Sequence, residues 1–135
     1  MSLVVDASVV VAALVDSSPV GAWAESVLLE GDLYAPALMP IETANLLRRL
    51  EAAGRIDKTT AGLAFGDLRQ LIWQEVPFEP CADRIWALRP NVTAYDAWYV
   101  AAAELLGVSL ATLDGRLIQA QGHRCGFVTF EARVE

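Results

Sequence analysis

Short apolar runs alternate with longer, helix-patterned stretches along the whole chain. This alternation is typical of an α/β fold, in which helices connect parallel strands. Parallel strands are buried on both faces, so they appear in a sequence as continuous apolar runs. The sequence therefore predicts an α/β protein with a central, mostly parallel sheet, folded as one domain over residues 1–135.

Turn and capping residues mark where the elements begin and end. Ser18 with Pro19 and Thr93 mark helix starts, whereas Gly54 and Gly107 mark helix ends. We expect helices at 9–14 (capped by Ser8), 19–29, 40–53, 58–71, 81–88, 94–106 and 117–120. Strands are expected at 3–5, 33–35, 108–112 and 126–130, and residues 72–76 are ambiguous.

The first fifteen residues superficially resemble a signal peptide. They lack a basic start, and Asp6 interrupts their apolar stretch, so we interpret them as a strand followed by a helix. No apolar run approaches the roughly 20 residues that span a bilayer. We therefore expect a cytoplasmic protein without membrane association.

The side-chain inventory excludes several classes of enzyme. His123 is the single histidine, and Cys81 and Cys125 have no metal-ligand spacing, so too few ligands exist for a zinc site. A nuclease with two catalytic histidines is excluded as well. No Gly-x-Ser-x-Gly turn accompanies His123 to indicate a Ser-His-Asp triad. Both cysteines are expected to be buried free thiols. The catalytic chemistry that these side chains leave open is that of carboxylates.

Four acidic residues follow a strand or begin a helix: Asp6, Glu42, Asp96 and Asp114. In open α/β sheets such positions meet at one edge, where ligands bind. Each acid alone also fits a helix-capping role. Two carboxylates about 5 Å apart repel by roughly 3 kcal/mol at an effective dielectric near 20, so a cluster of four requires a cation. Oxygen ligands of this kind suit Mg²⁺.

Polar residues accompany the acids at regular spacing. Ser8 follows Asp6 by two positions, and Thr112 precedes Asp114 by two, so each hydroxyl is expected to point the same way as its acid. Asn45 lies three residues after Glu42, on the same helix face.

Four motifs in order resemble a known family. They are V-V-D-A-S at 4–8, P-x-E-x-x-N at 40–45, Y-D-A-x-Y-V-A-x-A at 95–103 and A-T-L-D at 111–114. Together they resemble the PIN-domain nucleases, and most closely the VapC-type toxins of toxin–antitoxin pairs. The resemblance covers essentially the whole chain. It implies a PIN-like α/β/α sandwich, Mg²⁺- or Mn²⁺-dependent RNA endonuclease activity, a homodimer and a cognate antitoxin that places a basic residue in the acidic site.

The resemblance also implies a role for each acid. Asp6, Glu42, Asp96 and Asp114 match the acidic quartet of the family, and Ser8, Asn45 and Thr112 match its polar support. We expect these four acids to form the metal site, with Asp6 and Asp96 as the main ligands and Asp114 helping them. Glu42 would also orient or deprotonate the attacking water, with Asn45 fixing Glu42 or a water. Many relatives have a further acidic or polar residue shortly after the fourth acid. Gly115, Arg116 and Leu117 stand there, so a fifth metal contact is not expected.

The net charge of −7 is unusual for a protein that binds nucleic acid. Arg49, seven residues after Glu42, is our first candidate for a phosphate contact, and Arg116 beside Asp114 is the second; ordinary solvated charges are the alternative for both. The four tryptophans are expected to pack in the core or an interface. Tyr99 could face either the site or the core.

Two alternative functions stay open. A catalytically silent PIN-fold scaffold or RNA-binding module would be expected to lose some of the acids, and all four are present. An aspartate-nucleophile phosphatase using Asp6 normally has a second Asp two positions later, where this chain has Ser8. It also needs a phosphate-binding lysine, and Lys58 is the only lysine.

Overall fold

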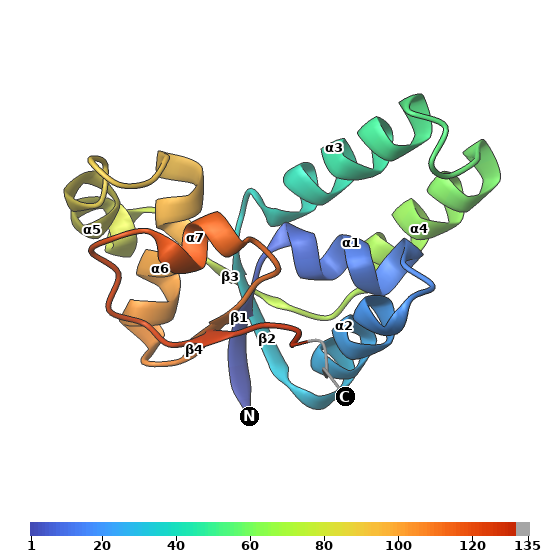
Figure 1. Cartoon of the computed structure of the whole chain (residues 1–135). Helices are drawn as coiled ribbons and strands as arrows, with labels where there is room; N and C mark the ends of the chain where they lie inside the picture. Colours follow the sequence, from blue (N-terminus) through green and yellow to red (C-terminus); the bar gives the residue numbers. More distant parts are fainter. Residues whose placement is uncertain (132–135) are drawn as a thin grey trace.

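The computed structural model describes residues 1–131 and contains a five-stranded sheet between two layers of helices (Figure 1). The strands are β1 (Ser2–Val5), β2 (Asp32–Pro36), β3 (Gln74–Val76), β4 (Ser109–Ala111) and β5 (Phe127–Val128). Their order is β3-β2-β1-β4-β5, and all four pairings are parallel. The predicted α/β/α sandwich with a mostly parallel sheet is confirmed.

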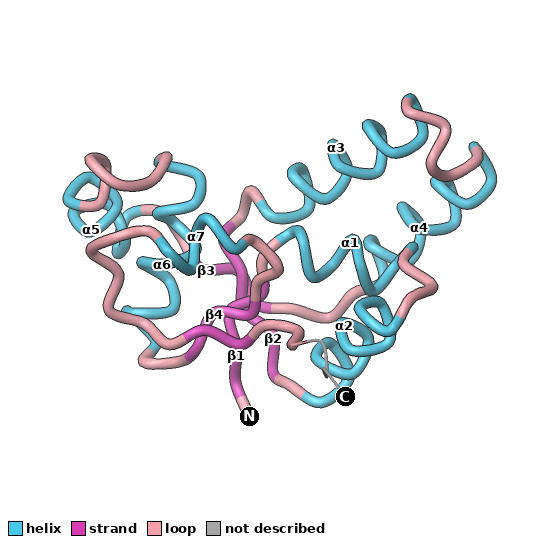
Figure 2. The backbone as a smooth tube through the Cα atoms, in the orientation of Figure 1, coloured by secondary structure: helices cyan, strands magenta, loops and turns pink. Residues whose placement is uncertain are grey.

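The helices form two groups on opposite faces of the sheet (Figure 2). One group holds α1 (Ala7–Val15), α2 (Pro19–Glu30), α3 (Met39–Ala52) and α4 (Lys58–Gln70). The other holds a 3₁₀ turn (Glu79–Cys81), α5 (Ala82–Ala87), α6 (Ala94–Leu106) and α7 (Gly115–Gln119). Each group therefore covers the apolar surface of one face.

The strand order reverses at β1. The chain runs outward from β1 through β2 to β3, and then returns to the other side of β1 to form β4 and β5. Val5, the last residue of β1, pairs with Ala111, the last residue of β4. The residues that follow the two strands therefore emerge side by side, at the kind of position where open α/β sheets bind ligands.

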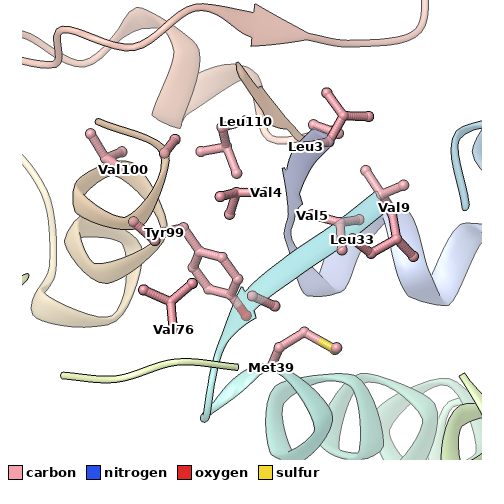
Figure 3. Close-up of a cluster of buried hydrophobic side chains, with 14 of the residues drawn as sticks. Leu3, Val4, Val5, Val9, Leu33, Met39, Val76, Tyr99, Val100 and Leu110 are labelled. Atoms are coloured by element: carbon pink, nitrogen blue, oxygen red, sulfur yellow. The ribbon is translucent and has the colours of Figure 1, made fainter. Parts of the chain in front are cut away.

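The core lies on both faces of the central strands (Figure 3). Val4 points to the α6 side, where Tyr99, Val100 and Leu110 lie, whereas Val5 points to the α1 side near Val9. These side chains are almost completely buried. Burial on both faces explains why β1 is an uninterrupted apolar run.

Several predicted boundaries need correction. Ser8 does not cap the first helix, because the Asp6 side chain accepts a hydrogen bond from the Val9 amide and α1 starts at Ala7. Helix α7 starts at Gly115 and not at residue 117, because Asp114 caps it. The ambiguous residues 72–76 contain the edge strand β3, and the helix expected at 81–88 is divided into the 3₁₀ turn and α5.

The cysteines and tryptophans largely follow the prediction. Both cysteines are free, although only Cys81 is fully buried. Three tryptophans pack against the core. Trp86 does not, since it is 68% exposed with the Arg89 guanidinium 4.3 Å from its ring centre, and its packing in an interface stays a prediction. Within residues 1–131 no single helix is long and apolar enough to cross a membrane; α1 and α2 pass that test only as a pair bent by 114°.

Gly21 allows α2 to pack closely against the end of α1. A β-carbon at Gly21 would lie 1.7 Å from the Asp16 carbonyl oxygen, so any side chain there must push the two helices apart. Gly66, in the exposed face of α4, has nothing within 4 Å of the same position.

We predict that Gly21→Ala lowers the free energy of unfolding by roughly 1–3 kcal/mol through overpacking. The matched control Gly66→Ala should raise it by about 0.5–1 kcal/mol, because alanine restricts the unfolded chain without strain in the helix. Urea denaturation measures both. Equal effects of the two substitutions would contradict the close approach at Gly21.

Candidate functional site

A pocket of about 350 Å³ opens beyond the carboxyl ends of β1 and β4, next to the first turns of α3 and α6. All four predicted acids line it: Asp6, Glu42, Asp96 and Asp114. Ser8, Asn45, Arg49 and Tyr99 also line it. The fold thus brings together side chains from four separate segments, and we refer to this hollow as the acidic pocket.

Asp6 is the most enclosed of the four acids, with 7% of its surface exposed. Its Oδ1 accepts hydrogen bonds from the Ser8 hydroxyl at 2.5 Å and from the Val9 amide at 3.2 Å. Its Oδ2 accepts a hydrogen bond from the Thr112 hydroxyl. Both carboxylate oxygens are therefore held in fixed directions.

The two hydroxyl groups are themselves oriented by the backbone. Ser8 Oγ accepts a hydrogen bond from the Leu113 amide at 3.0 Å, and Thr112 Oγ1 accepts one from the Asp114 amide at 3.0 Å. With these bonds in place, each hydroxyl proton is directed at Asp6. The sequence spacing paired Thr112 with Asp114, whereas the Thr112 hydroxyl supports Asp6, which is 106 residues away in the chain.

Glu42 is held by a residue that the sequence did not assign. Tyr99, only 2% exposed, donates a hydrogen bond from its hydroxyl to Glu42 Oε1 at 2.6 Å. Asn45 lines the pocket, but its Oδ1 accepts a hydrogen bond from Arg48 Nε at 3.1 Å. Tyr99, and not Asn45, therefore supports Glu42, and no spacing within α3 indicates that contact. The alternative that Asn45 fixes a water stays a prediction.

Asp96 and Asp114 combine capping with a place in the pocket. Thr93 Oγ1 accepts a hydrogen bond from the Asp96 amide at 3.2 Å, which places Asp96 in the first turn of α6. Asp114 Oδ1 accepts hydrogen bonds from the amides of Arg116 and Leu117 at 3.0 and 3.4 Å, and so caps α7. Asp114 therefore caps a helix and lines the acidic pocket as well, and Asp96 lies both in a capped first turn and in the pocket.

The pocket disfavours the negative charge of three of its acids, Asp6, Glu42 and Asp96. Burial raises the pKa of Asp6 despite its hydrogen bonds. Burial is also the main cause that raises the pKa of Glu42, with the charges of Asp96 and Asp6 adding to it. The pKa of Asp96 is raised by burial and by the charge of Asp114. A cation in the pocket would reverse each of these penalties.

The donor set fits a hard cation. Within residues 1–131 no three acidic, histidine or cysteine side chains stand close enough to enclose a metal ion by themselves. Mg²⁺ keeps several of its waters and needs only one or two direct carboxylates, so an open pocket lined by four acids satisfies its requirements. Asp6, Asp96, Asp114 and Glu42 are the residues that could hold it.

The two candidate arginines lie in different places. Arg49 lines the acidic pocket, as its spacing from Glu42 predicted. Arg116 is exposed on α7, where its backbone amide contacts Asp114, and it is not among the residues that line the pocket.

A larger hollow of about 660 Å³ adjoins the acidic pocket between α1 and α3, and we refer to it as the α1–α3 groove. Its walls are mostly apolar and include Val11, Leu50 and Ile56, with Arg55 beside them. Four residues line both hollows: Ser8, Leu46, Arg49 and Leu113. The groove is therefore continuous with the acidic pocket.

Comparison with solved structures supports the fold. PAE2754 from Pyrobaculum aerophilum superposes with a TM-score of 0.68 at 21% identity, over 96% of this chain and 89% of its own. VapBC2 from Rickettsia felis, bound to a DNA fragment from its promoter, superposes with a TM-score of 0.67 at 11% identity, over 97% of this chain and 100% of the matched chain. At these identities the match establishes the architecture alone.

Sequence comparison identifies the family. Ribonuclease VapC1 from Mycobacterium tuberculosis is 39% identical over 123 residues, which cover 90% of this chain and 92% of the relative. Ribonuclease VapC9 from the same species is 36% identical over 123 residues, covering 91% and 94%. The family model of the PIN domain matches residues 3–122. The chain accordingly belongs to the PIN domain family, in its VapC branch.

Proposed function

We propose that this chain is an Mg²⁺-dependent endoribonuclease, the toxin of a toxin–antitoxin pair, which hydrolyses phosphodiester bonds of a specific cellular RNA in the acidic pocket. The observation that carries the proposal is Asp6, a buried carboxylate held by two oriented hydroxyls beside three further acids. VapC1 and VapC9 are ribonucleases by name, which supports RNA as the substrate.

The four acids would have two roles in the reaction, to hold the metal ion and to orient the attacking water. Asp6, Asp96 and Asp114, with Glu42, would hold a divalent ion, which supplies a water of lowered pKa and neutralises charge on the phosphate. Ser8 and Thr112 keep Asp6 in one orientation, so it does not reorganise during the reaction.

Glu42 would act on the nucleophile. Its Oε1 is occupied by Tyr99, so its Oε2 orients the attacking water and accepts its proton. The water oxygen bonds to phosphorus and the bond from phosphorus to the 3′ oxygen breaks. The 3′ oxygen takes a proton from solvent water, so the products carry 5′-phosphate and 3′-hydroxyl ends. Arg49 is the basic side chain among the residues lining the pocket, and it would contact a phosphate of the RNA.

The α1–α3 groove suits a protein partner. We place the antitoxin there, because an apolar segment can fill the groove while a basic residue of the same segment reaches the acids through the shared wall. The charge of a basic residue is opposite to that of the acids, which favours such an arrangement. The solved VapBC2 structure contains a chain of similar fold. The homodimer and the cytoplasmic location expected from the sequence stay predictions.

The alternatives have less support. A silent scaffold or RNA-binding module gives no reason for four acids from separate segments to line one pocket. A phosphatase needs a lysine at its site, but Lys58 begins α4 and is not among the residues that line the acidic pocket. Ser8 also uses its hydroxyl on Asp6, the group that would have to act as nucleophile.

We expect the purified chain to cut total cellular RNA at a few defined sites with Mg²⁺ or Mn²⁺, and not with EDTA. Asp6→Asn and Asp96→Asn should each reduce cleavage by about 100-fold or more, because each removes charge from the proposed metal site. Asp67→Asn, an exposed acid on α4, is the matched control and should cut normally. Sequencing of fragment ends identifies the sites. Cuts that persist in the Asp6 variant would overturn the proposal.

The metal-free protein should become less stable, relative to Asp6→Asn, as the pH rises. The pKa of Asp6 in the folded state lies above its ordinary value of 3.8, because burial disfavours the charged carboxylate. The loss of folding stability from this burial is therefore absent below about pH 3.8, grows as the pH rises towards the folded-state pKa, and is complete above it. Thermal melts from pH 4 to 7.5 in EDTA measure the difference. Added Mg²⁺ should stabilise the wild type and not the variant. If the melting temperatures of the wild type and the variant change in parallel with pH, and added Mg²⁺ changes neither, the result would count against a cation site at Asp6.

The two arginines should differ in their effect on RNA binding. Arg49→Ala should weaken binding of uncut RNA and lower the slope of log affinity against log salt by about 0.7, as expected for one lost contact with single-stranded phosphate. Binding is measured by fluorescence anisotropy in Ca²⁺ at several salt concentrations. Arg116→Ala, outside the pocket, should change the slope less. The reverse ranking would assign the phosphate contact to α7.

A further inference from the structure

Tyr99 connects the apolar core to the acidic pocket. Its ring lies among buried side chains, with Val76 and Val100 near it and Met39 of α3 beyond the end of β2 (Figure 3). Its hydroxyl is at the pocket, where it donates to Glu42 Oε1 at 2.6 Å. One side chain therefore belongs both to the packing of the fold and to the candidate site.

The contact fixes Glu42 more firmly than Glu42 could be fixed from its own helix. A glutamate side chain has three rotatable bonds and Glu42 is only half-buried, so it would otherwise sample several positions. The Tyr99 ring is held by packing, so its hydroxyl has a set position. A buried hydroxyl also needs a hydrogen-bond partner, which makes the contact favourable for both groups.

The contact also distinguishes the two oxygens of Glu42. Oε1 accepts from Tyr99, whereas no hydrogen bond to Oε2 is formed within residues 1–131, and Glu42 lines the acidic pocket. A glutamate is long enough to reach from the first turn of α3 to Tyr99 while keeping its second oxygen free. Aspartate is one methylene shorter, so it would have to give up one of the two contacts.

We propose that Tyr99 is a positioning residue, which holds Glu42 so that one defined carboxylate oxygen faces the attacking water. This inference rests on the proposed function, since it gives Tyr99 a part in RNA hydrolysis. Tyr99 acts through Glu42 and does not touch the RNA.

The kinetic test is a double-mutant cycle measured by single-turnover cleavage of a mapped RNA site. Tyr99→Phe keeps the ring and the packing, and should lower the rate at saturating RNA about tenfold or more, with RNA affinity unchanged, as expected for loss of one hydrogen bond to a charged group. Tyr95→Phe, exposed in the same helix, is the matched control and should cut at the wild-type rate. The Tyr99→Phe/Glu42→Ala double variant should be no slower than Glu42→Ala alone.

A second readout does not depend on activity. Proton NMR of the metal-free protein should show a tyrosine hydroxyl proton protected from exchange with solvent. The signal should persist in Glu42→Gln, whose amide oxygen still accepts, and in Asp96→Asn, but it should disappear in Tyr99→Phe and in Glu42→Ala. A signal that survives Glu42→Ala would overturn the contact.

The outcomes separate this inference from the proposed function. Wild-type protein that shows the protected hydroxyl but cuts no RNA would overturn the nuclease and leave the contact in place. Wild-type cleavage together with an unchanged rate in Tyr99→Phe would overturn the positioning role and leave the nuclease in place. Effects of Tyr99→Phe that add fully to those of Glu42→Ala would assign Tyr99 a structural part only.

Discussion

The parallel pairing of β1 with β4 is the constraint on which the site depends. It aligns Val5 with Ala111, and the Asp6 amide continues the ladder by donating to the Ala111 carbonyl at 3.1 Å. The residues that follow the two strands then bond to each other. The Thr112 hydroxyl after β4 donates to the Asp6 carboxylate, and Ser8 after β1 accepts from the Leu113 amide. A shift of this pair by one residue would turn the interlocked side chains to opposite faces and dismantle the network.

The molecule combines an apolar core with a small region that is costly to fold. Val4, Val5 and Leu110 are fully buried, and directly after β1 the chain encloses Asp6, whose negative charge is disfavoured by burial. Natural proteins place such unfavourable groups where function requires them, and the remaining core compensates. The arrangement explains why the acids lie at strand and helix ends, where the rigid sheet holds them in place.

The sequence predicts those parts of the site that follow from local rules. Asp6 and Asp114 each follow an apolar strand, and parallel strands end at one edge, so their meeting was predictable. The contact of Tyr99 with Glu42 spans 57 residues and depends on how α3 and α6 pack, which no local pattern describes. Asn45 shows the opposite case: its spacing suggested Glu42 as partner, but Arg48 in the next turn of the same helix competes for it. Strand β3 was ambiguous because only one of its three residues is buried.

The shared wall between the acidic pocket and the α1–α3 groove has a thermodynamic consequence. Ser8, Leu46, Arg49 and Leu113 belong to both hollows, so a molecule that fills one changes the surface offered to a molecule in the other. Such coupling is reciprocal. If a ligand in the groove lowers the affinity of the pocket for its ligand by some factor, the pocket ligand lowers the affinity of the groove for its own ligand by the same factor. Occupancy of each hollow therefore depends on the concentrations of both ligands, each relative to its own affinity.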